Sequence, residues 1–194
     1  MKNKQTPEIA SAAPDSPVAE RTIMAGFGGQ GIMLAGKIGV RAGLFLGRRV
    51  TYIPSYGAEV RGGTAHCHVT VSRFEIASPI IARPDFCLVM NSPSLAKFAG
   101  RVREGGTLII NSSLVDEPSG RSDLAEVRIP ANRIAEDRGT IKAANMALLG
   151  AFIRHSKLLT LEAVRQILEE AIPPRHRNLL EINLAALGDG YEQA

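Results

Sequence analysis

Residues 22–46 read TIMAGFGGQGIMLAGKIGVRAGLFL, and this stretch decides the fold. Residues 22–25 are a short apolar run that ends in glycines, which is typical of a buried strand. Residues 31–46 follow with a helical period, and one broad face can carry Ile32, Leu34, Ala35, Ile38, Ala42, Phe45 and Leu46. Gly47 stands where a left-handed cap ends such a helix. The stretch therefore predicts a strand, a glycine turn and a helix, the opening unit of an α/β fold.

Further strands are expected at residues 50–53, 64–72, 86–90, 107–110 and 127–129. The segment 64–72 alternates, with Ala65, Cys67, Val69 and Val71 on one face and His66, His68, Thr70 and Ser72 on the other. The runs at 86–90 and 107–110 do not alternate, which favours a parallel sheet covered on both sides. Pro54 is expected to stop the second strand and to open a loop over residues 54–63.

The second half of the chain has mainly helical patterns. Helices are expected at residues 94–98, 142–155, 161–171 and 178–187. Thr160 is the expected N-cap of the third, and Gly188 is expected to end the last. These patterns predict an α/β fold: a Rossmann-like, mostly parallel sheet flanked by helices, with a C-terminal helical layer.

Length and composition indicate one globular domain. The 194 residues are 45% hydrophobic and 22% charged. Order is expected to begin at Arg21, so that residues 1–20 form a flexible leader and residues 21–194 a single domain. The net charge of +4 is scattered, aromatic residues make up 5% and tryptophan is absent, which argues against nucleic-acid binding.

The cellular setting is predicted from what the sequence lacks. Lys37 and Arg41 interrupt the longest apolar stretch, so we expect no membrane span. Two cysteines without an export signal favour the reducing cytoplasm.

The turn GFGGQG at residues 26–31 matches the dinucleotide pattern G-x-G-x-x-G between a strand and a helix. Glycine lets backbone N–H groups approach a ligand, and a helix N-terminus attracts phosphate. The expected contacts are Gly28, Gly29, Gln30 and Gly31. A dinucleotide site also needs an acidic residue about 20 positions later; residues 44–55 offer Arg48 and Arg49 instead, which leaves an NADP-type site open. The alternative is a tight turn that binds nothing.

A second loop, PSYGAEVRGG at residues 54–63, is rich in polar chemistry between glycines. Arg61 can present a planar donor fork to a carboxylate or phosphate, and it is the candidate catalytic residue. The alternative is a simple ion pair between Glu59 and Arg61. The candidate cofactor-binding residues of this loop are Tyr56, Gly57, Glu59, Gly62 and Gly63.

Together these motifs resemble the gamma subunit of 2-oxoacid:ferredoxin (acceptor) oxidoreductases. The resemblance rests on GFGGQG at 26–31, SYGAEVRGGTA at 55–65, IASPII at 76–81 and Pro84-Asp85, and it is strong over residues 22–112. It implies a subunit of a hetero-oligomer that decarboxylates a 2-oxoacid, passes electrons to iron–sulfur clusters and makes an acyl-CoA. Residues 28–31 and 56–63 are then the expected contact elements near coenzyme A.

The resemblance also implies where the cofactors lie. Thiamine diphosphate and iron–sulfur clusters belong to partner subunits, the alpha and beta (thiamine-binding) chains and an iron–sulfur subunit, and this chain alone binds none. Two cysteines, too few for the four ligands of a cluster, agree with this. 2-Oxoglutarate is slightly preferred as substrate; pyruvate, branched-chain and aromatic oxoacids remain open, as does the acceptor, ferredoxin or NAD.

Two other functions remain as alternatives: a free-standing NAD(P)-dependent dehydrogenase and a non-enzymatic α/β adaptor. His66, Cys67 and His68 suggest a metal site, but on a strand the cysteine points away from the histidines, so we expect no metal. Cys87 is expected to be inert core.

Overall fold

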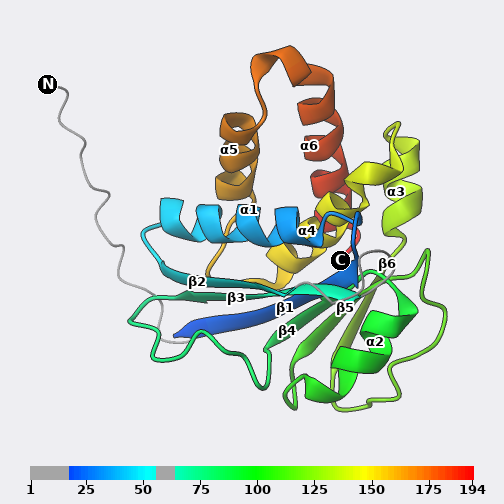
Figure 1. Cartoon of the computed structure of the whole chain (residues 1–194). Helices are drawn as coiled ribbons and strands as arrows, with labels where there is room; N and C mark the ends of the chain where they lie inside the picture. The colour runs from blue at the N-terminus through cyan, green and yellow to red at the C-terminus, as the bar shows by residue number, and fades with distance from the viewer. Residues whose placement is uncertain (1–17, 56–63) are drawn as a thin grey trace, which may run out of the picture.

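The computed structural model describes residues 18–55 and 64–194 (Figure 1). Six strands form one sheet in the order β2-β3-β1-β4-β5-β6. They are β1 (Ala19–Phe27), β2 (Arg49–Ser55), β3 (Thr64–Ser72), β4 (Phe86–Val89), β5 (Thr107–Asn111) and β6 (Ala125–Ile129). β3 is antiparallel to both of its neighbours, and β1, β4, β5 and β6 are parallel. Within the described residues β3 alone is reversed, which confirms the mostly parallel α/β fold.

Helices cover both faces of the sheet. They are α1 (Ile32–Phe45), α2 (Ser92–Phe98), α3 (Ala131–Asp137), α4 (Ala144–His155), α5 (Leu161–Ala171) and α6 (Arg177–Glu192), with short 3₁₀ turns η1 (Ala99–Arg101), η2 (Ile141–Ala143) and η3 (Pro174–His176). α2 lies on one face, α1 and α4 lie on the other, and α5 and α6 pack outside these two (Figure 1). The C-terminal helical layer is therefore confirmed. None of the helices in the described part of the chain is long and apolar enough to cross a membrane.

The sheet separates two hydrophobic cores, one on each of its faces. Cys67, Val69 and Val71 belong to the larger core beneath α1 and α4. The smaller core lies beneath α2 and includes Ile23, Cys87 and Phe98. Thr160 caps α5, as predicted, with its hydroxyl accepting from Ala163 N at 3.2 Å. Gly47 takes the predicted left-handed conformation after α1, with φ at +70°.

Among the predicted boundaries that differ from the structure, three wrong ones have a clear structural context, two of them in the strands. β1 begins at Ala19, which pairs with Ser72 of β3, and the buried carboxylate of Glu20 accepts hydrogen bonds from Ser156 Oγ and Lys157 N, both at 2.6 Å. β2 continues through Pro54 to Ser55; it is an edge strand, where a missing N–H is tolerated. Residues 1–17 of the predicted leader lie outside the described residues.

The third wrong boundary is the end of α6, which continues past Gly188 to Glu192, and the helix α3 was not predicted. The extension of α6 has a packing reason. A Cβ at Gly190 would overlap the carbonyl of Ala147 in α4, and a Cβ at Gly150 would overlap the carbonyl of Leu187 in α6. Gly150 and Gly190 therefore allow α4 and α6 to pack closely, and they do not mark the end of a helix.

The close approach of α4 and α6 gives a testable prediction. Gly190→Ala is expected to lower the free energy of unfolding by about 1–3 kcal/mol, the usual cost of overpacking. Gly188→Ala, in the same helix, is the matched control, because its Cβ would come no nearer than 3.4 Å to Arg165 Nη2. Alanine also has a helix propensity about 1 kcal/mol better than glycine. Denaturant unfolding of both variants tests this, and equal destabilisation would contradict it.

Candidate functional site

The glycine turn lies at the carboxyl end of β1, at the centre of the sheet. Gln30 N donates to Phe27 O at 3.2 Å and closes the turn. Gly29 and Gly31 have φ of +95° and +76°, a region that favours glycine over residues with a side chain. The sequence GFGGQG therefore forms a tight left-handed turn from strand to helix.

The side chain of Gln30 holds this turn in shape. Its Oε1 accepts from Phe27 N at 2.7 Å and from Asn91 Nδ2 at 2.9 Å. The other atom of that amide, Asn91 Oδ1, accepts from Ser94 N and caps α2. The Gln30 oxygen thus joins the turns that follow β1 and β4. Its two hydrogen bonds stabilise the turn and do not require a ligand.

The glycines of the turn fall into two groups. Gly26 and Gly31 are packed: a Cβ at Gly26 would lie 3.0 Å from Met90 Cβ, and one at Gly31 would overlap Asn145. Asn145, in α4, donates from Nδ2 to Gly31 O at 3.0 Å. Gly28 and Gly29 face open space, because a Cβ added at either would meet no heavy atom within 4 Å. The backbone is therefore accessible at Gly28 and Gly29.

The N-terminus of α1 adds donors beside these two glycines. Its N-cap, Gly31, has no side chain, and its first turn has no acidic residue. Ala35 N donates to Gly31 O at 3.0 Å, whereas Ile32, Met33 and Leu34 have no backbone acceptor among the described residues. Unpaired N–H groups and the helix dipole together favour an anion.

These groups border a hollow of about 390 Å³, which we call the glycine-turn hollow. Its lining includes Phe27, Gly28, Gly29, Gly31, Ile32, Met33, Leu34, Lys37 and Ala65. Of these lining residues Lys37 alone is charged, and it shares the hollow with the open glycines. The hollow combines backbone donors and one lysine with apolar walls, an arrangement that suits a phosphate carried on a larger organic group.

The second predicted loop, residues 56–63, lies outside the described residues, and with it Tyr56, Gly57, Glu59, Arg61, Gly62 and Gly63. Its flanking strands are described. β2 ends at Ser55, β3 begins at Thr64, and Thr64 is the register partner of Phe27. The loop therefore joins the sheet beside the glycine turn, and the roles of its residues stay predictions.

Arg48 and Arg49 do not lie near the glycine turn, and the expectation that they help to hold a phosphate there is wrong. Arg49 pairs with Ser72, which pairs with Ala19 at the start of β1. The turn follows Phe27, eight residues further along, or about 26 Å at the rise of a strand. An NADP-type site built from the glycine turn and these arginines is excluded by this distance.

Sequence reasoning missed a row of amide side chains at the same edge of the sheet. Asn91 follows β4, and Asn111 ends β5. Asn111 Oδ1 accepts from Ala131 N at 3.2 Å, and its Nδ2 donates to Asn132 Oδ1 at 3.0 Å. The sequence did contain a signal for this row, namely a polar residue at the end of each apolar run. Because the carboxyl ends of parallel strands lie along one edge of the sheet, such residues are expected to lie near one another.

The motif His66-Cys67-His68 has the predicted alternation. The two imidazole rings lie 5.6 Å apart, between their centroids, on the α2 side of β3, while Cys67 lies in the core beneath α1. Cys87 lies in the opposite core, so the chain's two cysteines do not converge. Burial raises the pKa of both thiols to about 12. Among the described residues no three His, Cys, Asp or Glu side chains are grouped as a metal site.

His66 is held neutral by its surroundings. Its ring packs against Phe98, with 4.9 Å between centroids. Burial, and then the charges of Lys97 and Arg101 with His68 beside them, lower the pKa of His66 from 6.5 to about 4. Protonation of this imidazole therefore opposes the folded structure.

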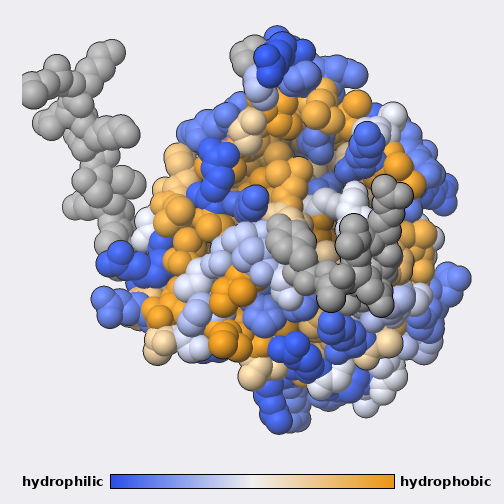
Figure 2. All heavy atoms as spheres, viewed as in Figure 1, coloured by the Kyte–Doolittle hydropathy of each residue, from blue (hydrophilic) through white to orange (hydrophobic). Residues whose placement is uncertain are grey.

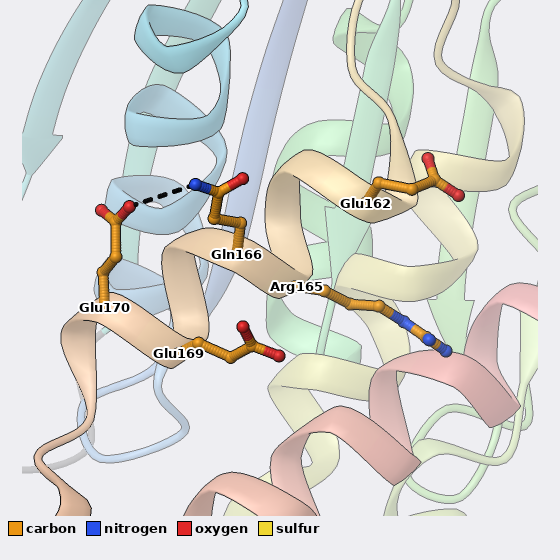
Figure 3. Close-up of a pocket in the computed structure, with 5 residues that line it drawn as sticks. All are labelled: Glu162, Arg165, Gln166, Glu169 and Glu170. Atoms are coloured by element: carbon orange, nitrogen blue, oxygen red, sulfur yellow. Dashed lines mark hydrogen bonds between the residues drawn. The ribbon is translucent and has the colours of Figure 1, made fainter.

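A second hollow, of about 500 Å³, lies on the outer helical layer along α5 (Figure 3). It is lined by Glu162, Arg165, Gln166, Glu169 and Glu170. Arg165 extends toward α6, and Gln166 Nε2 donates to Glu170 at 3.5 Å (Figure 3). Three carboxylates around one guanidinium disfavour an anionic ligand, so the smaller glycine-turn hollow is the better candidate site.

Comparison with known proteins identifies the family. A family model described as pyruvate ferredoxin/flavodoxin oxidoreductase matches residues 21–193. The chain belongs to this family. The 2-oxoglutarate synthase subunit KorC of Methanothermobacter thermautotrophicus is 33% identical, over 87% of this chain and 92% of its own length. The predicted family membership is thereby confirmed, and the relative is itself named as a subunit of a 2-oxoacid-converting enzyme.

Two further similarities show different arrangements of the same fold. The ketoisovalerate oxidoreductase subunit VorA of Methanothermobacter marburgensis is 36% identical over 90% of this chain, and the chain spans about a third (36%) of that protein. The structure of the gamma subunit of a keto/oxoacid ferredoxin oxidoreductase from Geobacter sulfurreducens is 26% identical. It matches with a TM-score of 0.78 over 90% of this chain and 98% of its own. The fold thus occurs both as a separate gamma subunit and as part of a longer chain.

The neutral His66 gives a prediction for acid stability. An unfolded histidine binds a proton near pH 6.5, whereas His66 in the fold does so near 4. Between these values the unfolded state holds more protons, so stability is expected to fall as the pH drops from about 6.5 to 4. His66→Gln is expected to flatten this dependence, and His176→Gln, at an exposed position, is the control. Urea unfolding from pH 4.5 to 8 measures the slope, and an unchanged slope in His66→Gln would refute the assignment.

Proposed function

We propose that this chain is the gamma-type subunit of a thiamine-dependent 2-oxoacid:acceptor oxidoreductase. The reaction converts a 2-oxoacid and coenzyme A to an acyl-CoA and CO₂, with release of one proton and two electrons that pass to ferredoxin or another acceptor. The observation that carries the proposal is the family match over residues 21–193, nearly all of the described chain.

The chain's own contribution is to bind coenzyme A at the glycine-turn hollow. A phosphate of coenzyme A would lie against the open backbone at Gly28 and Gly29 and the free N–H groups of α1. Lys37 supplies a cation on the lining, and Met33 and Leu34 offer apolar contact to the rest of the molecule. Gln30 and Gly31 act by holding the turn, through Asn91 and Asn145 respectively.

The redox cofactors are assigned to partner subunits. Thiamine diphosphate supplies the decarboxylation chemistry and iron–sulfur clusters accept the electrons, and we propose that alpha and beta (thiamine-binding) subunits and an iron–sulfur subunit hold them. Cys67 and Cys87 support this assignment, because they lie in separate cores on opposite sides of the sheet. Buried thiols with a pKa near 12 are poor ligands, since a cluster binds thiolates.

The loop at residues 56–63 completes the proposed site. Arg61 is proposed to form a bidentate hydrogen bond with one of three groups: the oxoacid carboxylate, a phosphate of coenzyme A or an acidic residue of a partner subunit. Tyr56, Gly57, Glu59, Gly62 and Gly63 are proposed to form the rest of the contact. Support comes from Thr64, the first residue after this loop, which is the register partner of Phe27 beside the glycine turn.

2-Oxoglutarate is the proposed substrate, supported by the KorC relative that the chain matches over 92% of its length. A branched-chain oxoacid is the second candidate, because a subunit named for ketoisovalerate is 36% identical to this chain.

Reconstitution tests this function. The chain is expected to co-purify with co-produced alpha, beta and iron–sulfur subunits, and the complex is expected to reduce ferredoxin with 2-oxoglutarate and coenzyme A. A complex assembled without this chain should lose coenzyme A-dependent turnover, and the isolated chain should hold no iron. A panel of oxoacids separates 2-oxoglutarate from ketoisovalerate. Failure to join the complex, or tight NAD(P) binding by the isolated chain with dehydrogenase activity, would contradict the proposal.

A further inference from the structure

The end of the sheet opposite the glycine turn carries three arginines that the proposed site does not use. Arg49 begins β2 and pairs in register with Ser72, the last residue of β3. The next residues outward, Arg48 and Arg73, therefore lie beside each other where the two strands end. Both lie about the length of a strand away from the proposed coenzyme A site.

These guanidinium groups have unmet hydrogen-bonding capacity. The Nε atoms of Arg48 and Arg73 are buried and have no hydrogen-bond partner among residues 18–55 and 64–194. Within the same residues Arg48, Arg49 and Arg73 form no ion pair, and the closest acidic residue in sequence, Glu75, forms none with them. Because a buried donor without an acceptor costs free energy, the arrangement calls for an acceptor beyond the described residues.

Large apolar side chains are exposed around the same arginines. Leu44 and Phe45 lie at the end of α1, and Phe74 directly follows Arg73. Phe74 is 64% exposed and Phe45 is 46% exposed. Figure 2 shows hydrophobic and hydrophilic residues side by side over the end of α1 and the adjoining ends of β2 and β3, at the left of the view. We call this surface, formed by Arg48, Arg49, Arg73, Leu44, Phe45 and Phe74, the arginine end.

We propose that the arginine end is a docking surface for a partner subunit of the oxidoreductase, one that presents carboxylates beside apolar side chains. The inference rests on the proposed function, because it assigns the partner to the same complex. Arginine and aromatic side chains are the residues that most often dominate protein interfaces. A carboxylate matches the donor fork of a guanidinium in a bidentate pair and would satisfy the Nε–H groups.

Two other occupants fit the surface less well. In a symmetric dimer of this chain the patch would face itself, and the arginines of one copy would meet those of the other. An anionic membrane surface is usually held by clusters of four to eight cations, and three are present. Charge complementarity therefore favours an acidic protein partner.

Binding of the purified partner subcomplex to this chain tests the proposal. Arg48→Glu/Arg73→Glu is expected to raise the Kd at least about tenfold, and Phe45→Ser/Phe74→Ser several-fold, by biolayer interferometry at 50 mM salt. The wild-type Kd should rise with salt, and this dependence should weaken in the charge variant, because fewer ion pairs remain to be screened.

Arg165→Glu/Arg175→Glu is the control. It makes the same charge change on the outer helical layer, and its Kd should stay within twofold of the wild-type value. Circular dichroism melts check that each variant is folded, and Arg48→Gln/Arg73→Gln provides a neutral substitution in case the glutamates disturb the strand ends.

Each other result has a distinct meaning. If the wild type binds the partner subunits and both arginine double variants bind equally well, the arginine end is not the docking surface, while the proposed function stands. If the wild type binds no partner subunit, both proposals fail. A wild-type dimer that the charge variant dissociates, or wild-type binding to phosphatidylserine vesicles with no effect of the variant on partner binding, would overturn the assignment to a partner subunit.

Discussion

One side-chain oxygen, Gln30 Oε1, connects the two turns on which the candidate site depends. It accepts from Phe27 N and from Asn91 Nδ2, so the turn after β1 is joined to the turn after β4. Because the same oxygen accepts both hydrogen bonds, the glycine turn has its conformation fixed in the absence of a ligand. The backbone N–H groups of the open glycines are then presented at no cost of reorganisation, which is the physical basis of a preorganised anion site.

This constraint also explains why the glycines differ. Gly26 and Gly31 are needed where Met90 and Asn145 leave no room for a side chain. Gly28 and Gly29 meet nothing and leave the backbone accessible. At the opposite end of the sheet, arginines and exposed apolar side chains form a surface of another kind. The glycine turn and the arginine end are separated by the length of a strand. The first is therefore suited to binding a small anion and the second to binding a protein.

Local patterns predicted most of the fold, and long-range packing accounts for what they missed. Three features depend only on residues that are close in sequence, and the sequence therefore predicts them: the glycine turn, the cap at Thr160 and the two faces of β3. The end of α6 was misplaced because Gly188 reads as a helix stop, and the contact of Gly190 with Ala147 is visible only after folding. Arg48 and Arg49 were misplaced for a similar reason: they are close to the turn in sequence, but the helix α1 and the strand direction carry them to the far end. Asn145 comes from a distant helix, and no local pattern links it to Gly31.

The central claim is that the turn held by Gln30 binds an anionic group of coenzyme A, and Gln30→Glu in the assembled enzyme tests it most directly. A glutamate keeps an acceptor oxygen for Phe27 N and Asn91 Nδ2, and a carboxylate near a helix N-terminus does not weaken the fold. The added negative charge, however, opposes an anion in the hollow. The account predicts an unchanged melting temperature and a Michaelis constant for coenzyme A raised about tenfold, equivalent to about 1.4 kcal/mol. An unchanged Michaelis constant for coenzyme A in the folded, assembled variant would contradict it.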